Sequence, residues 1–206
     1  MPSRAVTKPV VLESGDRLTR AEFHRYFCDR PDIKKAELVE GVVYVASPVR
    51  FDLHAEQHGN LVTWLGMYKT GTSGLRMGAD ATVILDDASQ LQPDAFLWRD
   101  EPGGPRLTDD HYLEGAPQLV VEIAANSASY DLHDKMDAYQ RNGVREYVVW
   151  RVLDEAIDWF RLSDGGFVRV DADKRGIIES KAFPGLRLHV PKMLAGDLAG
   201  VLAELG

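Results

Sequence analysis

The stretch Gln118-Leu-Val-Val-Glu-Ile-Ala124 decides the fold. Both of its faces are apolar apart from Glu122, which is the pattern of a central strand covered on two sides. A predicted helix at residues 132–142 and a second strong strand at residues 146–152 follow it. Since strands that alternate with helices are typical of α/β proteins, the unit over residues 118–152 predicts one α/β domain.

Local signals set the ends of the helices. Ser127 to Ser129 can cap the helix that follows the central strand, and Gly143 stands at its C-terminal capping position. Thr19 and Glu22 have capping-box spacing, which predicts a helix to about Cys28. The other predicted elements are a hairpin at 36–46, helices at 52–69 and 191–205, strands at 81–85, 94–98, 157–162, 167–170 and 183–189, and loops at 86–92 and 99–117.

Composition excludes several classes of protein. The chain has 206 residues, 45% hydrophobic and 27% charged, which fits one globular domain and excludes disordered and fibrous proteins. Residues 1–16 lack periodicity and are predicted to form an arm, so the domain is expected over residues 17–206. Apolar runs are far shorter than the roughly 20 residues of a membrane helix, and no secretory signal is visible. A single cysteine, Cys28, excludes an internal disulfide, so we expect a cytoplasmic protein.

The charge balance limits the partners. Lys and Arg number 24 and Asp and Glu 32, giving a net charge of −8. Nucleic-acid binding domains usually have a basic surplus, because phosphate neutralisation supplies most of their non-specific affinity. A role on nucleic acid must therefore depend on a local basic patch, a metal ion, or both. Five arginines either gather to guide a phosphate backbone or lie scattered in solvent: Arg141, Arg145, Arg151, Arg161 and Arg169.

Glu122 is the most informative single residue. An ionised carboxylate inside a buried strand costs several kcal/mol unless a cation pairs with it or a metal binds it. Asp94 follows Pro93 at the start of another short strand, which could lie beside the strand of Glu122. Two adjacent carboxylates repel each other unless a proton or a divalent cation lies between them, and Mg²⁺ is usually held by one or two carboxylates. A simple ion pair to a buried Arg or Lys is the alternative.

Lys135 is a candidate cation for this acidic pair. It lies about one turn into the helix after the Glu122 strand and could reach back over the strand end. There it could neutralise charge on a phosphate or orient an attacking water. Alternatively, it is a solvated lysine paired with Asp131 four residues earlier, and Asp131 itself has the position of a helix N-terminal acid.

Other notable residues have simpler interpretations. His54 and His58 are four residues apart, but their glutamate is misplaced for a zinc protease motif, so two surface histidines are predicted, with substrate contact by His54 as an alternative. Cys28 is predicted to pack in the first helix. The aromatic residues predicted to lie in the core are Tyr139, Tyr147, Trp150 and Trp159.

Taken together, the motifs resemble the Uma-type family of restriction endonucleases, within the PD-(D/E)XK nuclease superfamily. The resemblance covers roughly residues 20–200, and the order and spacing of its motifs are specific. The motifs are Glu37-Leu-Val-Glu40-Gly41, Pro93-Asp94, Gly115-Ala-Pro-Gln-Leu-Val-Val-Glu122-Ile, Ser127 to Asp131, Lys135, Tyr139, Gly143-Val-Arg-Glu-Tyr147 and Phe183-Pro-Gly-Leu186.

The resemblance implies a restriction-endonuclease-like domain with a mixed central sheet flanked by helices. It implies that Asp94 and Glu122 bind Mg²⁺ or Mn²⁺, with the backbone carbonyl of Ile123 as a further ligand. The superfamily lysine two positions after the glutamate is absent, since Ala124 stands there, and Lys135 would replace it. Glu40 would be a fourth catalytic member, or else a turn residue before Gly41.

The function implied is metal-dependent hydrolysis of a DNA phosphodiester bond. A homodimer is compatible with cutting both strands. The alternative is a nuclease fold kept as a non-catalytic binding or regulatory module, which the net charge and the missing lysine at position 124 favour. The direction of Lys135 separates the two hypotheses, because only an enzyme needs that lysine in the acidic site. A zinc hydrolase built on His54 and His58 is a weaker third hypothesis.

Overall fold

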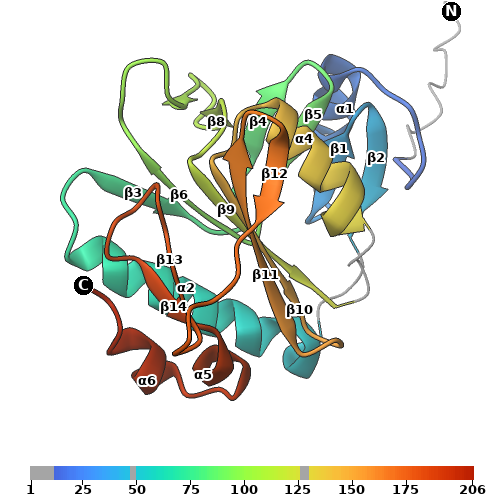
Figure 1. Cartoon of the computed structure of the whole chain (residues 1–206). Coiled ribbons are helices and arrows are strands. Elements are labelled where there is room, and N and C mark those ends of the chain that lie inside the picture. Colours follow the sequence, from blue (N-terminus) through green and yellow to red (C-terminus); the bar gives the residue numbers. More distant parts are fainter. Residues whose placement is uncertain (1–11, 47–49, 126–129) are drawn as a thin grey trace, which may run out of the picture.

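The computed structural model describes residues 12–46, 50–125 and 130–206, with strand β9 (Leu119–Ala124) at its centre. All six residues of β9 are buried, as its apolar faces predict. The strand belongs to a six-stranded sheet in the order β12-β11-β10-β9-β6-β3 (Figure 1). The other members are β3 (Leu75–Gly78), β6 (Ala95–Arg99), β10 (Glu146–Arg151), β11 (Ala156–Ser163) and β12 (Gly166–Arg169).

The predicted strand–helix–strand unit forms the parallel part of this sheet. Strands β9 and β10 are parallel, with Val121 opposite Val148, and the other pairs in the sheet are antiparallel. A parallel pair needs a crossover connection. Here the crossover contains η2 (Asp131–Lys135), a π-helical turn, and α4 (Met136–Arg141). The predicted caps at 127–129 and most of the predicted arm lie outside the described residues.

Helices cover both faces of the central sheet, with α4 above and α2 (Glu56–Thr70) below it in Figure 1. Val121 and Ile123 of β9 belong to the core on the α2 side, and Val120 and Ala124 belong to the core on the α4 side. This alternation explains why β9 is apolar on both faces. The buried stripe of α2 is the predicted one, made by Leu61, Trp64, Leu65 and Tyr68.

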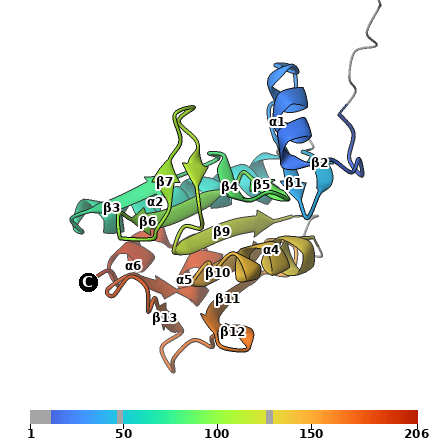
Figure 2. The same cartoon turned by 90° about the horizontal axis from the view of Figure 1, so that it is seen from above.

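A second mixed sheet carries the N-terminal hairpin. Its order is β2-β1-β5-β4-β8-β7, and α1 (Arg20–Cys28) packs on the hairpin through Phe23 (Figure 2). The capping box of Thr19 and Glu22 is present as predicted. The strands are β1 (Ala36–Val39), β2 (Val42–Val45), β4 (Val83–Asp86), β5 (Ser89–Leu91), β7 (Arg106–Leu107) and β8 (Leu113–Glu114).

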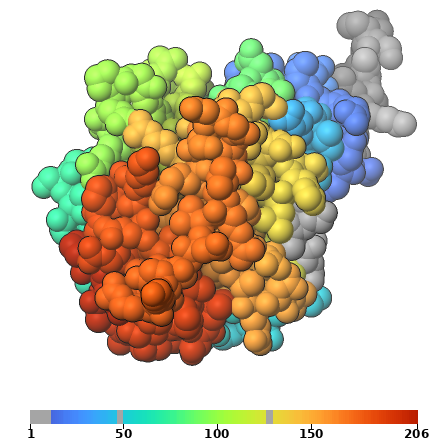
Figure 3. Space-filling view, viewed as in Figure 1, coloured from blue at the N-terminus to red at the C-terminus, as the bar shows by residue number. Residues whose placement is uncertain are grey.

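The C-terminal part packs on the α2 side of the central sheet and occupies the lower part of the face in Figure 3. It contains a two-stranded sheet and two short helices. The prediction of a single helix at 191–205 is wrong, because the helix is interrupted at Gly196, which has a φ of 75°. The elements are β13 (Ile177–Glu179), β14 (Arg187–His189), α5 (Val190–Leu194) and α6 (Leu198–Leu202).

Three other sequence predictions need correction. The loops predicted at 86–92 and 99–117 contain the short strands β5, β7 and β8. The helix predicted from residue 52 starts with a π-helical turn, η1 (Phe51–Ala55). Cys28 is exposed rather than packed, with its Sγ 3.7 Å from Nε2 of His24.

Among the helices that the structure describes, none combines the length and apolar character needed to span a bilayer.

Candidate functional site

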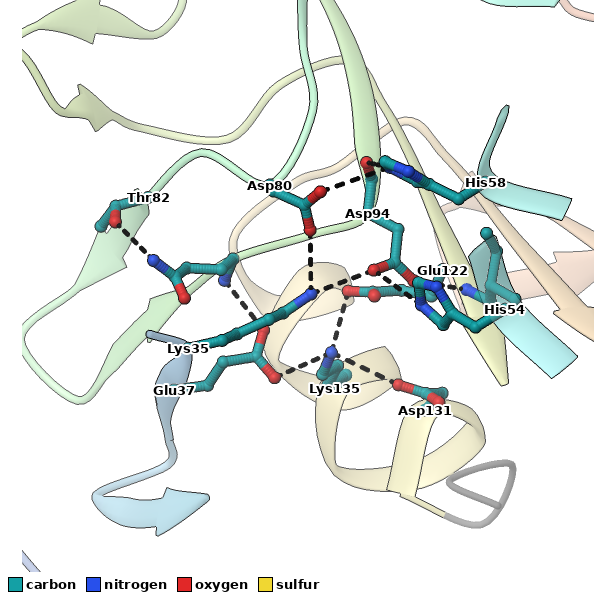
Figure 4. Close-up of polar contacts among 12 residues, drawn as sticks. Lys35, Glu37, His54, His58, Asp80, Thr82, Asp94, Glu122, Asp131 and Lys135 are labelled. Carbon is teal, nitrogen blue, oxygen red and sulfur yellow. Dashed lines mark hydrogen bonds and ion pairs between the residues drawn. The ribbon is translucent and has the colours of Figure 1, made fainter. Parts of the chain in front are cut away.

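The antiparallel register of β6 and β9 brings the two predicted acids together. Ala95 pairs with Val121, so continuing the register by one residue places Asp94 opposite Glu122. Both residues are almost completely buried, with 3% and 2% of their surface exposed. The backbone N–H of Ile123 donates to Oδ2 of Asp94 at 2.8 Å, which ties the Asp94 carboxylate to β9. The predicted acidic pair therefore lies side by side, Glu122 within β9 and Asp94 directly before β6 (Figure 4).

Asp94 is held as a carboxylate by groups from three segments. Its Oδ1 lies 3.0 Å from Nζ of Lys35 and 3.2 Å from Nε2 of His54. The Nε2 of His58 lies 2.8 Å from the backbone oxygen of the same residue. Burial alone would raise the pKa of Asp94, but the His54 hydrogen bond and the charge of Lys35 hold it well below its usual range. Asp94 is thus an ionised carboxylate in a fixed position.

Glu122 lies in the opposite electrostatic situation. Its Oε1 accepts a hydrogen bond from the Tyr139 hydroxyl at 2.8 Å and lies 3.1 Å from Nζ of Lys135. Burial raises the pKa of Glu122 well above its usual range, because the attraction of Lys135 is opposed by the nearby charges of Asp94 and Glu37. Without a further cation, burial therefore favours the protonated form of Glu122.

Lys135 points into the acidic site, and it also makes the predicted pair with Asp131. Its Nζ lies 2.9 Å from Oε2 of Glu37, 3.1 Å from Oε1 of Glu122 and 3.4 Å from Oδ1 of Asp131. Only 5% of its side chain is exposed. Burial alone would lower the pKa of Lys135, but Glu122 and Glu37 raise it well above its usual range, so the ammonium stays charged.

Glu37 is the residue of the hairpin that reaches the site, and Glu40 does not. Glu40 lies in the turn between β1 and β2 with a φ of 52°, and its ion pair in the described part of the chain is with Arg141. Glu37 lies within β1, all four residues of which are buried. An acid in an apolar strand is the signal that singled out Glu122, so the same signal could have found Glu37.

The prediction that His54 and His58 are surface histidines is also wrong. His54 lies in η1 and His58 in the first turn of α2, and both contact Asp94. Their side chains are only 20% and 22% exposed. The exposed Asp80 completes this side of the site, 3.5 Å from His58 and 3.3 Å from Lys35. Lys35 has no periodic signal in the sequence, because it lies just before β1.

The site carries more negative than positive charge. Five carboxylates, from Glu37, Asp80, Asp94, Glu122 and Asp131, lie against the two lysines. Such oxygen-rich donors suit hard divalent cations. Among the described residues, no three metal-ligating side chains converge on one point. The carboxylates are instead held together by the two lysine ammonium groups. The residues therefore fit a cation that binds with water and substrate oxygens completing its shell.

The five arginines, for which the sequence left open a gathered basic edge or scattered side chains, all take part in ion pairs. Each is paired with at least one carboxylate: Arg141 with Glu40 and Asp86, Arg145 with Glu101, Arg151 with Asp154 and Asp158, Arg161 with Glu146, and Arg169 with Asp158. The predicted aromatic core residues are buried, from Tyr139 and Tyr147 to Trp159 and Trp150.

The chain is similar to a known protein family and to a solved structure. Residues 20–191 match the model of the Uma2 family, described as "Putative restriction endonuclease". A crystal structure from Anabaena variabilis ATCC 29413, described as "a putative nuclease belonging to DUF820", is similar with a TM-score of 0.63 and 11% identity, over 78% of this chain and 89% of that chain. That likeness shows the restriction-endonuclease-like fold. No curated protein matches the chain.

Proposed function

The chain belongs to the Uma2 family, and from this membership and the site geometry we propose that it is a metal-dependent nuclease that hydrolyses DNA phosphodiester bonds. The observation that carries the proposal is the buried pair of Asp94 and Glu122 on neighbouring strands, with Lys135 directed at Glu122. This direction of Lys135 is the one expected of an enzyme rather than of a non-catalytic module. Cutting both strands of a duplex needs two sites, which a homodimer would supply.

Asp94 and Glu122 would hold Mg²⁺ or Mn²⁺, with the backbone carbonyl of Ile123 as a further ligand. The ion would polarise the phosphate and lower the pKa of its bound water. The chain's own residues prepare this site: Ile123 fixes Asp94 through its N–H, and Tyr139 fixes Glu122 through its hydroxyl. Lys135 supplies the positive charge that keeps the crowded carboxylates in place.

A non-catalytic binding module is the second candidate function. It is favoured by the net charge of −8, by Ala124 at the position of the superfamily lysine, and by the pairing of the five arginines with acids. A cleavage assay separates the two candidates.

The test uses plasmid, branched and single-stranded DNA with Mg²⁺, Mn²⁺ or EDTA. We expect divalent cations to support cutting and EDTA to abolish it. Asp94→Asn should lower the rate by about 100-fold or more, because it removes an ionised ligand from the reacting centre. Asp87→Asn, at a fully exposed carboxylate, should leave the rate unchanged. Cutting that survives Asp94→Asn contradicts the site, and no cutting by folded protein favours the binding module.

A further inference from the structure

The two lysines of the site differ in how their donors are used. A lysine ammonium has three N–H donors. In Lys135 these meet three carboxylates, those of Glu37, Glu122 and Asp131, and the side chain is 5% exposed. Lys135 has no donor left for a substrate, and moving it would leave three buried carboxylates facing one another. Such an ammonium suits an internal counter-ion.

Lys35 lies at the open side of the same cluster. Its side chain is 26% exposed, and Nζ lies 3.0 Å from Oδ1 of Asp94 and 3.3 Å from Oδ1 of Asp80 (Figure 4). In the described residues these are its two ion-pair partners, which leaves one donor available. Asp80 is itself 53% exposed, so this donor lies at the border between the buried acids and solvent.

Lys35 also stays charged in this position. Burial alone would lower its pKa, but Asp94, Glu122 and Glu37 raise it above its usual range. A compact ammonium on a flexible stem is a common partner of phosphate oxygens. The side chain of Lys35 is partly exposed, and its Nζ lies next to Asp94, a predicted metal ligand.

We propose that Lys35 is a catalytic residue that donates a hydrogen bond to a non-bridging oxygen of the scissile phosphate, and that Lys135 is a positioning residue. The proposal rests on the proposed nuclease function and divides the work between two cations. Lys135 holds the carboxylates at the strand ends, and Lys35 neutralises charge on the phosphate. No proton is transferred in this contact, so Lys35 is an ammonium before and after it.

The test compares Lys35→Gln with Lys34→Gln. Lys34 is the adjacent lysine, but it is exposed and donates to the backbone oxygen of Pro31 at 2.7 Å instead of reaching the site. Binding of a fluorescently labelled DNA duplex is measured by anisotropy in Ca²⁺, which takes the same oxygen ligands, over a range of salt concentrations. Cleavage is measured in Mg²⁺ at saturating DNA, and melting curves establish that each variant is folded.

For Lys35→Gln we expect kcat to fall by about 100-fold, as for loss of one transition-state donor. The slope of log affinity against log salt should decrease by about 1, as for loss of one phosphate contact. Lys35→Arg should keep the salt slope, since it keeps the charge, and Lys34→Gln should keep kcat. If Lys35→Gln instead matches Lys34→Gln in both measurements, the assignment of Lys35 is overturned.

The failure of each proposal has its own signature. A wild-type protein that cleaves DNA, with Lys35→Gln equally active and equally salt-dependent, overturns the Lys35 contact and leaves the nuclease intact. A wild-type protein that binds DNA in Ca²⁺ but never cleaves it overturns the nuclease, and the change in salt slope still decides the phosphate contact. A wild-type protein that binds no DNA in Ca²⁺ overturns both.

Discussion

At the scale of single residues, Lys135 is the group on which the acidic site depends. Removing one partner of a buried ion pair typically costs 3–5 kcal/mol, because it leaves an uncompensated buried charge. Lys135→Met keeps most of the volume but leaves Glu37, Glu122 and Asp131 without their shared cation. We therefore expect it to lower the free energy of unfolding by about 3 kcal/mol or more in urea titrations at neutral pH.

Lys192→Met is the matched control for this loss of stability. Lys192 also makes an ion pair, at 3.0 Å to Glu204, but its side chain is 33% exposed. Ion pairs that remain partly open to solvent contribute about 1 kcal/mol or less, so this variant should lose much less stability than Lys135→Met. Equal effects of the two substitutions would mean that Lys135 does not balance the buried carboxylates.

The site residues that could be predicted from sequence are those that the local pattern shows to be buried. Asp94 and Glu122 could be predicted because an acid in an apolar strand needs a partner, and Glu37 had the same unused signal in β1. Lys35 and His54 could not be predicted, since they reach Asp94 only through tertiary packing. The spacing of four between His54 and His58 indicates one shared helix face, but no sequence pattern tells what that face contacts.

At the scale of elements, two glycines lie in opposite packing environments, one in an open part of a helix and one in a tightly packed strand. Gly66 lies in α2, and a Cβ added there would meet nothing within 4 Å. Gly78 lies in β3, and a Cβ there would be 2.1 Å from the ring of Phe96 on β6. The same Gly→Ala change should therefore stabilise α2 by about 0.5–1 kcal/mol and destabilise β3 by about 1–3 kcal/mol.

Thermal and urea unfolding of Gly66→Ala and Gly78→Ala check this difference in sign. Phe96 is only 3% exposed and has little room to move aside, which is why the clash cannot be relieved cheaply. A Gly78→Ala variant as stable as the wild type would show that β3 can shift away from β6. Because the two variants carry the same chemical change, each serves as the control for the other.

The long elements could be predicted from sequence and the short ones could not. The capping box of α1, the stripe of α2 and the apolar run of β9 each carry a complete local signal. Strands β5, β7 and β8 have only two or three residues, and distant pairing partners define them. The C-terminal helix was predicted as one piece because its apolar pattern continues past Gly196.

At the scale of the whole molecule, a chain of net charge −8 concentrates acidic groups around one buried site. The fold explains this concentration, because two sheets and the crossover helix each deliver carboxylates to the same strand ends. Glu37 of β1 and Glu122 of β9 share Lys135 as an ion-pair partner. Sequence order alone could not show this, because the two strands belong to different sheets. The stability of the metal-free protein should consequently depend on pH through this site.

The sign of that dependence follows from Glu122. Because burial raises its pKa above the value of the unfolded chain, the folded protein binds this proton more tightly. Its contribution to the free energy of unfolding is therefore lost as pH rises above the ordinary glutamate value. Glu122→Gln has no such proton to lose. In EDTA, we expect the stability of this variant relative to the wild type to increase steadily from about pH 5 to about pH 8.

Urea unfolding across that pH range measures the difference, and Glu204→Gln is its control. The partly exposed Glu204 has its pKa lowered by the hydrogen bond from Lys192, so its ionised form favours the folded state. The stability of Glu204→Gln relative to the wild type should therefore decrease slightly as pH rises through the range in which glutamate ionises. This is the opposite trend to that of Glu122→Gln. If Glu122→Gln also loses stability relative to the wild type as pH rises, then the attraction of Lys135 outweighs the cost of burying the charge. Glu122 is then ionised in the folded protein. A divalent cation would then meet two ionised carboxylates at this site rather than displace a proton from one of them.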